Sequence, residues 1–234
     1  MAVNIDTVYQ KVLTLANKEQ RGYITPQEFN LLADRAQKEI VENYFHEVKT
    51  AERKPKNQMA YADEVEMLEE KLQPLHVDST ISTSTSNLSL PEGIYKLIGV
   101  SRGGNKVTQV NKSQIAYTEN NPLTKANILR SVFVREDVNA LTVYPAPTTA
   151  TDFEVSYYKT PSTPNWGYVV VSNKALYNSN TSTNFELHES EEESLVSRIL
   201  MLAGITIKQP DIQQAGGAAI QMTKQEQNSK IWDY

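Results

Sequence analysis

The sequence predicts an α+β protein in which both ends of the chain form one helical layer and an antiparallel β-sandwich or curled sheet is inserted between them. Apolar residues recur every three to four positions over residues 1–75, alternate with a period of two through much of 76–186, and return to a helical pattern over 187–234. Turn-forming residues separate the short alternating runs. We therefore expect a helical part at 1–75, a β insertion at 76–186, and C-terminal helices with a docking tail at 187–234 that pack with 1–75.

Apolar stripes indicate the first and third helices of the N-terminal part. The first helix should end near Arg21 and Gly22, and Pro74 should stop the third, because the residue before a proline avoids helical geometry. Short links between three amphipathic helices favour antiparallel packing. The predicted buried residues are Ile5, Val8, Val12 and Leu15 in the first helix and Tyr61, Val65, Leu68 and Leu72 in the third.

The second helix has the clearest start signal in the chain. Thr25 offers an N-cap hydroxyl, Pro26 suits the first helical position, and Glu28 can reach back to complete a capping box. Ile24 can pack on Phe29 as a hydrophobic staple. The pattern continues for about 25 residues, longer than the usual globular helix. Its apolar face comprises Phe29, Leu32, Ala33, Ala36, Ile40 and Tyr44.

The composition changes at Leu75 to Ser, Thr, Val, Tyr and Asn, which suit strands and turns. A glycine pair within residues 102–105 lies between two alternating runs and predicts a hairpin. The Ser/Thr-rich segment 78–91 is either an exposed edge strand or a mobile loop, and we favour a loop combined with an edge strand. Strands are predicted at 94–100, 106–110, 131–135, 140–144 and 153–158.

A strongly apolar helix is predicted after residue 187. Ser190 and Glu193 have the spacing of a second capping box, and the carboxylates over 189–193 suit the positive end of a helix dipole. The helix body is apolar almost all round, so most of its sides must be covered. The N-terminal helices are the simplest cover. Beyond Pro210 the chain is polar and Gln-rich.

Composition excludes several classes of function. The 234 residues carry 23 Lys and Arg against 28 Asp and Glu, a net charge of −5, which argues against tight nucleic-acid binding. The chain has no cysteine, which excludes disulfides, thiolate nucleophiles and zinc–sulfur sites. No apolar run approaches the length that spans a bilayer, and the N-terminal residues lack a signal-peptide pattern, so we expect neither a membrane segment nor a secretion signal.

We expect no enzymatic activity, no metal site and no cofactor. The three histidines, His46, His76 and His188, fall in three different predicted elements. Glu42 and His46 share a helix face at i,i+4, but a second histidine is missing, so a solvated face is the better interpretation. For His188 we expect a pairing with the carboxylates that follow it. The 12 tyrosines leave surface recognition of a sugar or base open.

Two regions resemble known bacteriophage proteins. Residues 12–30 (VLTLANKEQRGYITPQEFN), with the long helix after them, look like the start of virion proteins of short-tailed, crAss-like bacteriophages. Residues 186–190 (ELHES), 202–205 (LAGI) and 208–211 (KQPD) look like the closing region of the head-to-tail adaptor, or tail tubular protein A-like, family. The order of helices, β insertion and helices also agrees with that family's layout.

The resemblance implies a structural virion protein, made in the host cytoplasm and placed at the head–tail junction. It implies a homo-oligomeric ring of twelve copies beneath the portal protein, above tail proteins, through which genomic DNA passes without specific binding. An alternative is a tail-associated recognition module whose β domain binds a glycan or receptor, and a third interpretation is an unrelated virion scaffold component.

The polar segment 211–234 ends in three large apolar side chains, Ile231, Trp232 and Tyr234. Trp and Tyr dominate interface hot spots, so these residues are the predicted contact with the portal or a neighbouring subunit. The alternative is that Trp232 folds back on its own helical layer.

Overall fold

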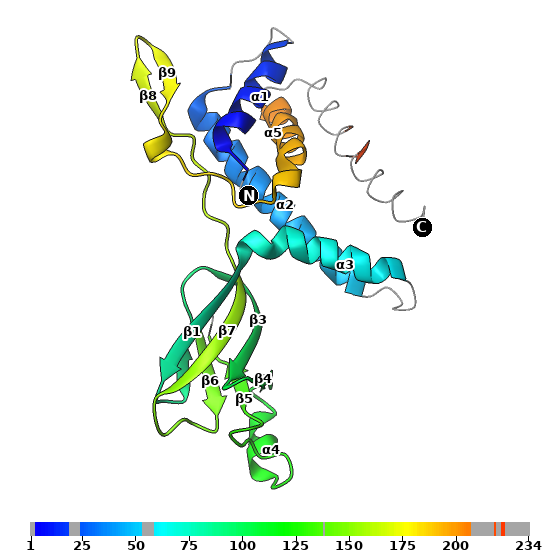
Figure 1. Ribbon diagram of the computed structural model, residues 1–234, viewed down its shortest axis with the longest axis vertical. Helices are drawn as coiled ribbons and strands as arrows, with labels where there is room; N and C mark the ends of the chain where they lie inside the picture. Colours follow the sequence, from blue (N-terminus) through cyan, green and yellow to red (C-terminus); the bar gives the residue numbers. More distant parts are fainter. Residues whose placement is uncertain are drawn as a thin grey trace. The chain divides into compact units, whose positions relative to one another are not determined.

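The computed structural model describes residues 3–18, 24–52, 59–137 and 139–206, together with 218, 221 and 222. The chain forms two compact units (Figure 1). Unit 1 combines Met1–Pro74 with Pro161–Tyr234, and unit 2 is Leu75–Thr160. Helices contributed by both ends of the chain, with a curled sheet inserted between them, confirm the predicted α+β class.

The helical layer of unit 1 is built around one helix from the C-terminal part of the chain. Helix α5 (Glu192–Thr206) packs against α1 (Ile5–Lys18) and α2 (Pro26–Glu52), and α3 (Met59–Leu72) packs against α2 (Figure 1). Apolar side chains of α5 are buried in this packing. The fully or nearly fully buried side chains of α5 are Leu195, Val196, Ile199, Leu202 and Ala203. The prediction that this apolar helix is covered by the N-terminal helices is confirmed.

Helix α2 begins with the predicted capping box. The Thr25 backbone N–H donates to Glu28 Oε2 at 2.9 Å, and the Glu28 backbone N–H donates to Thr25 Oγ1 at 3.3 Å. Ile24 and Phe29 are both buried, as the staple requires. Along the predicted apolar face, Phe29, Ala33, Ala36, Ile40 and Tyr44 are buried, and Leu32 is half-buried.

One predicted core position in α1 is wrong. Leu15 is 45% exposed, whereas Ala16 is buried together with Ile5, Val8 and Val12. At 3.6 residues per turn, Ala16 lies about 20° from Ile5 around the helix axis, while Leu15 lies about 80° away. The predicted end of this helix at residues 21–22 and the side chain of Tyr61 in α3 lie outside the described part of the structure.

The start of α5 also differs from its prediction. A short 3₁₀ helix (Glu189–Glu191) precedes α5, and the acceptor that caps it is His188 Nδ1, which lies 3.3 Å from the Ser190 backbone N–H. Ser190 Oγ lies 2.9 Å from the same nitrogen. The predicted Ser190–Glu193 capping box is therefore wrong, and His188 pairs with Ser190 rather than with the carboxylates.

Over residues 75–137 and 139–160, unit 2 contains one seven-stranded sheet in the order β1-β7-β3-β4-β5-β6-β2. Strands β1 and β2 lie at opposite edges of this order, yet only residues 84–86 join them, so the sheet must curl until its edges approach each other. Pairs are antiparallel except β4–β5, which is parallel and corrects the expectation of a wholly antiparallel sheet. The strands are β1 (His76–Thr83), β2 (Asn87–Ser89), β3 (Ile94–Arg102), β4 (Asn105–Gln109), β5 (Val132–Arg135), β6 (Ala140–Tyr144) and β7 (Thr151–Lys159).

The inward faces of the curled sheet form the core of unit 2. Fully buried members include Leu88, Leu141, Val143, Phe153 and Val155. The predicted glycine hairpin joins β3 to β4, with φ of 53° at Gly103 and 79° at Gly104, which are left-handed values that glycine adopts without strain. The Ser/Thr-rich segment forms β1 and β2 as edge strands with a short turn between them. The short helix α4 (Ile115–Asn120) was not expected.

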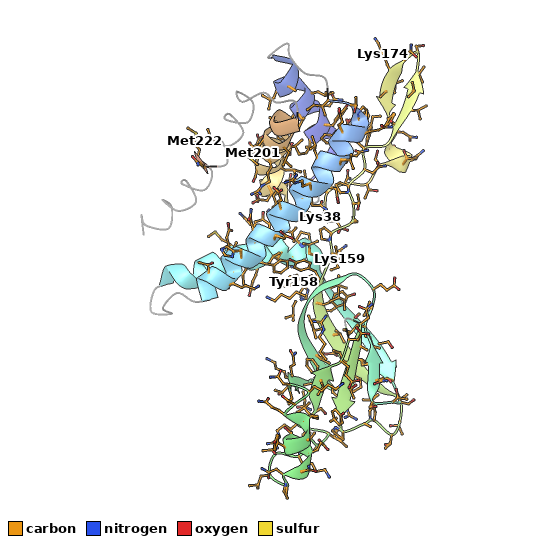
Figure 2. All side chains as sticks on the ribbon, turned by 180° about the vertical axis from the view of Figure 1, so that it is seen from behind. Lys38, Tyr158, Lys159, Lys174, Met201 and Met222 are labelled. Atoms are coloured by element: carbon orange, nitrogen blue, oxygen red, sulfur yellow. The ribbon has the colours of Figure 1, made fainter. Side chains whose placement is uncertain are left out.

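The structure groups residues 161–186 with the helices, although the sequence pattern placed them in the β insertion. They contain a separate two-stranded hairpin, β8 (Tyr168–Val171) and β9 (Lys174–Tyr177). In Figure 2, Lys174 marks the outer end of this hairpin. Strand-like sequence alone does not reveal which layer a hairpin joins, because both layers offer apolar surfaces.

Candidate interaction site

The three histidines do not form a site. His46 is exposed on α2, His76 lies 3.7 Å from Asp78 and meets the Tyr158 ring edge-on, and His188 caps a helix. Among the described residues, no group of three or more His, Cys, Asp or Glu side chains is arranged to hold a metal ion. Nor does the described part contain a helix with the length and apolar character needed to cross a membrane.

Two side chains of α2 hold the segment that carries the β8–β9 hairpin. Gln37 is fully buried, donates to the Ser162 carbonyl oxygen at 2.8 Å and accepts from the Glu186 backbone N–H at 3.1 Å. Asn30, two turns earlier on the helix, accepts from the Trp166 backbone N–H at 2.8 Å. Because these bonds hold partly buried backbone groups at both ends of the segment, they fix where the hairpin leaves the helical layer.

A close backbone approach stabilises the root of the hairpin. The Asn178 backbone N–H donates to the Gly167 carbonyl oxygen at 2.9 Å, and the Gly167 N–H donates to Ser182 Oγ at 3.0 Å. A Cβ at position 167 would lie 2.8 Å from the backbone carbonyl carbon of Thr181. Only glycine fits this approach without displacement of the neighbouring chain.

Trp166 forms the centre of an aromatic cluster between α1 and the hairpin. Its exposed fraction is 2%, and its indole N–H donates to Asp6 Oδ1 at 2.9 Å. The Tyr9 ring lies 4.2 Å from it between centroids, and the Tyr168 and Tyr177 rings lie 5.9 and 5.8 Å away. The cluster combines apolar burial with a satisfied polar atom, the usual arrangement for a buried tryptophan.

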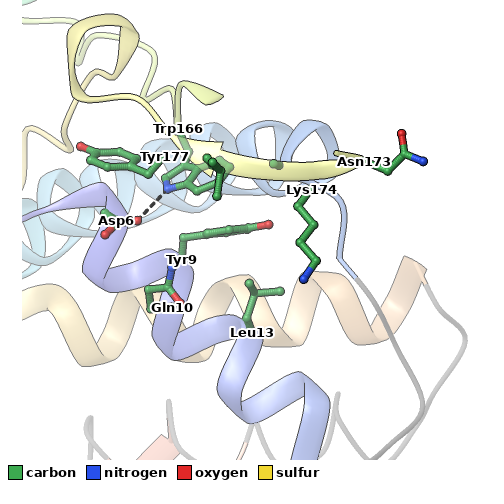
Figure 3. A pocket seen from close by; sticks show the side chains of 10 residues that line it. Asp6, Tyr9, Gln10, Leu13, Trp166, Asn173, Lys174 and Tyr177 are labelled. Atoms are coloured by element: carbon green, nitrogen blue, oxygen red, sulfur yellow. Dashed lines mark hydrogen bonds between the residues drawn. The ribbon is translucent and has the colours of Figure 1, made fainter. Parts of the chain in front are cut away.

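Beside this cluster lies a groove of ≈ 590 Å³, shown in Figure 3. Helix α1 supplies one wall and the β8–β9 hairpin supplies the other, and the rings of Tyr9 and Trp166 lie between them. The α1 residues recur at helical spacing on one stripe. The groove is lined by Asp6, Tyr9, Gln10, Leu13, Trp166, Asn173, Lys174, Ala175, Leu176 and Tyr177.

The hairpin is unusually apolar for an exposed element. By register, Val169 faces Leu176 across the two strands and lies on the same side as Val171. These three side chains are 50%, 53% and 49% exposed, and Val170 on the other side is 61% exposed. A contiguous exposed apolar surface of this kind marks an interaction site more often than a solvated face.

Ion pairs hold the helices that support the groove. Lys11 Nζ of α1 lies 2.6 Å from Glu193 Oε1 and 2.9 Å from Glu192 Oε1 of α5. The hydrogen bonds to Glu193 and Glu192 raise the pKa of Lys11. The carboxylates that the sequence placed at the helix start therefore link α5 to α1, in addition to suiting the helix dipole.

A second link joins α3 to the same helix start. Lys71 Nζ lies 2.9 Å from Oε1 of Glu191, which is 6% exposed, and 5.5 Å from the centre of the Tyr44 ring. Burial, reinforced by the Glu191 carboxylate, raises the pKa of Tyr44. We interpret this cluster as structural, because each charge has an opposite partner.

The site residues predicted from sequence, Ile231, Trp232 and Tyr234, lie outside the described residues. The structure instead shows a groove whose main residues, Trp166, Lys174 and Leu176, were not predicted. One sequence signal could have located the hairpin, namely the polar pair Ser172 and Asn173 between two apolar runs. In the structure these two residues adopt φ of 49° and 60°, the left-handed values of a two-residue hairpin turn.

Two comparisons with known proteins bear on identity. A search of curated proteins finds no match. The family model described as SU10 adaptor protein matches residues 7–229, which is almost the whole chain and includes both units. The chain therefore belongs to the SU10 adaptor protein family, and is a structural adaptor protein of a bacteriophage virion.

Proposed function

We propose that the protein is a head-to-tail adaptor that forms a closed ring beneath the portal protein and extends the DNA channel towards the tail. The observation that carries this proposal is the match to an adaptor family over residues 7–229. An adaptor must contact at least two partners, and the chain offers two compact units for them. The resemblance to head-to-tail adaptors of short-tailed, crAss-like phages supports twelve copies in the ring.

The charge of the chain supports a channel role. Unit 1 contains 15 Lys and Arg and 21 Asp and Glu, and unit 2 contains 8 and 7. Each phosphate that a protein neutralises adds salt-dependent affinity for DNA. A predominantly acidic protein therefore lets genomic DNA pass without holding it.

The alternative role, recognition of a glycan or receptor by the β unit, receives less support. Stacking on a sugar needs aromatic side chains gathered on one exposed face. Among the described aromatic residues of unit 2, Tyr95 in β3 and Tyr117 in α4 are the exposed ones, at 46% and 79%. Tyr157 is buried and Tyr158 is half-buried, so their strand offers no aromatic platform.

Electron microscopy of the purified protein mixed with its portal protein tests the proposal. We expect rings that stack coaxially on the portal and that show twelvefold symmetry in class averages. A protein that stays monomeric and never associates with the portal would contradict the ring. Binding to a glycan array through unit 2, without portal association, would favour the recognition role instead.

A further inference from the structure

We propose that the groove between α1 and the β8–β9 hairpin receives residues 231–234 of a neighbouring copy of the chain. This inference rests on the proposed function, because it assigns a surface to the contact between adjacent subunits of the ring. The occupant is the segment Ile231, Trp232, Asp233 and Tyr234. Four properties of the groove and of the segment lead to this choice.

The lining of the groove suits aromatic side chains. Tyr177 presents a ring that is 39% exposed, Leu13 and Leu176 add aliphatic surface from the two walls, and the almost fully buried rings of Tyr9 and Trp166 lie between the walls (Figure 3). A buried Trp or Tyr removes 150–250 Å² from water and prefers offset or edge contacts with other rings. The volume of ≈ 590 Å³ lies within the usual range for a bound ligand, so the groove can accommodate more than one side chain.

The charges of the groove and the segment are complementary. Lys174 is exposed at the hairpin end of the groove, and in the described part of the structure it makes no ion pair (Figure 3). At the other end, the Asp6 carboxylate is already engaged by the Trp166 indole. The proposed segment carries one charged side chain, Asp233, between its two aromatic residues. A pairing of Lys174 with Asp233 would fix the direction in which the segment lies.

The chain between the helical layer and the segment is long enough. Helix α5 ends at Thr206, and 24 residues separate it from Ile231. Fully extended, these residues span up to about 80 Å. That length allows the segment of one copy to reach the groove of the next.

Docking between copies also has the required symmetry. A segment of one subunit in a groove of another makes a heterologous contact, and repetition of such a contact gives either a closed ring or an open filament. The contact therefore supplies the link that the proposed ring needs. Docking of the segment in the groove of its own subunit would add no link between copies.

The absence of native cysteine permits a direct test in the full-length chain. In the variant Lys174→Cys with Asp233→Cys, mild oxidation should form disulfides between subunits, seen as a ladder of covalent oligomers on a non-reducing gel. The matched control is Lys125→Cys with Asp233→Cys, since Lys125 is an exposed lysine of unit 2, far from the groove in sequence. The control should remain monomeric on the gel.

Charge exchange and truncation of one side chain provide the second test. Lys174→Glu and Asp233→Lys should each weaken self-association, measured by sedimentation, and the two together should restore it. Lys125→Glu should have no effect. Trp232→Ala should raise the concentration needed for assembly at least about tenfold, the consequence of the loss of one aromatic anchor. Circular dichroism confirms that each variant is folded.

Three results would overturn the inference. They are a disulfide that forms only within single chains, no disulfide above the Lys125 control, and an unchanged assembly midpoint in Trp232→Ala. None of them would by itself contradict the adaptor function. Electron microscopy of the same variants with the portal protein tests the adaptor function separately from the groove contact. Rings that assemble on the portal without this disulfide would support the adaptor function and contradict the groove contact.

Discussion

Trp166 donates its indole N–H to the Asp6 carboxylate at 2.9 Å, although 160 positions separate the two residues in the chain. The bond joins the segment that carries the β8–β9 hairpin to the first turn of α1. It therefore connects the two walls of the groove that we propose as the subunit contact.

A double-mutant cycle measures this link. Asp6→Ala and Trp166→Phe should each destabilise the protein, and their effects should couple by about 1.5–3 kcal/mol, because a hydrogen bond to a charged group contributes roughly that much. Chemical denaturation of the wild type, both single variants and the double variant gives the coupling energy. Simple additivity of the two effects would show that the bond contributes nothing.

The capping box of α2 should be visible in stability. Thr25→Ala removes the acceptor for the Glu28 backbone N–H and should lower the free energy of unfolding by about 1 kcal/mol. Thr25→Ser keeps the hydroxyl and should lose much less. A loss of no more than a few tenths of a kcal/mol for the alanine variant would mean that this cap does not stabilise the helix start.

The same box predicts a direction for acid titration. The hydrogen bond from the Thr25 backbone N–H, followed by that from its hydroxyl, lowers the pKa of Glu28 in the folded state. A carboxyl with a lowered folded pKa adds stability above its unfolded pKa and loses it as the pH falls through the folded value. NMR titration should therefore place the pKa of Glu28 below the ordinary value of a glutamate carboxyl, and Glu28→Gln should destabilise the protein at pH 7 but not at strongly acidic pH.

The buried amide of Gln37 should be important for the hairpin's position. Gln37→Ala removes the partner of the Ser162 carbonyl and of the Glu186 N–H, which are both partly buried, so each lost hydrogen bond should cost about 1 kcal/mol. Glu42→Ala, at an exposed position of the same helix, is the matched control and should change stability by less than about 0.5 kcal/mol. Equal effects of the two substitutions in thermal unfolding would refute the role assigned to Gln37.

Deletion of residues 211–234 should separate folding from assembly. Two glycines and many polar residues give this segment little capacity to stabilise a core, so the shortened chain should keep its circular dichroism melt. The shortened chain should no longer bind the portal protein in a pull-down and should no longer self-associate. Unfolding on deletion would favour Trp232 folding back on its own subunit, and undiminished binding would reject the anchor role.

Much of the fold follows from local patterns. The Thr25–Glu28 capping box and the Gly103–Gly104 turn involve residues at most three apart, so their hydrogen bonds and backbone angles are encoded in short stretches of sequence. The α5 start shows the limit of that approach. Ser190 and Glu193 have the spacing of a capping box, but the His188 imidazole, two residues earlier, accepts the bond instead.

The candidate site could not be predicted in the same way. The hairpin turn at residues 172–173 is a local signal, yet the groove exists only because Gln37 and Asn30 hold the hairpin's segment against α2, across more than 120 positions of chain. The parallel β4–β5 pair is a similar case. No short stretch of sequence records that these two strands lie side by side, because the chain between them forms α4 and a long loop.

The apolar periods, the α2 capping box and the glycine turn could all be predicted from the sequence, and with them the order of helical and β parts, because these features depend on hydrogen bonds and side-chain spacing within a few residues. Only the tertiary structure decided that residues 161–186 join the helices and that Trp166 meets Asp6 and Tyr9 to form a groove. Those contacts depend on the packing of distant segments, which burial drives without regard to distance along the chain.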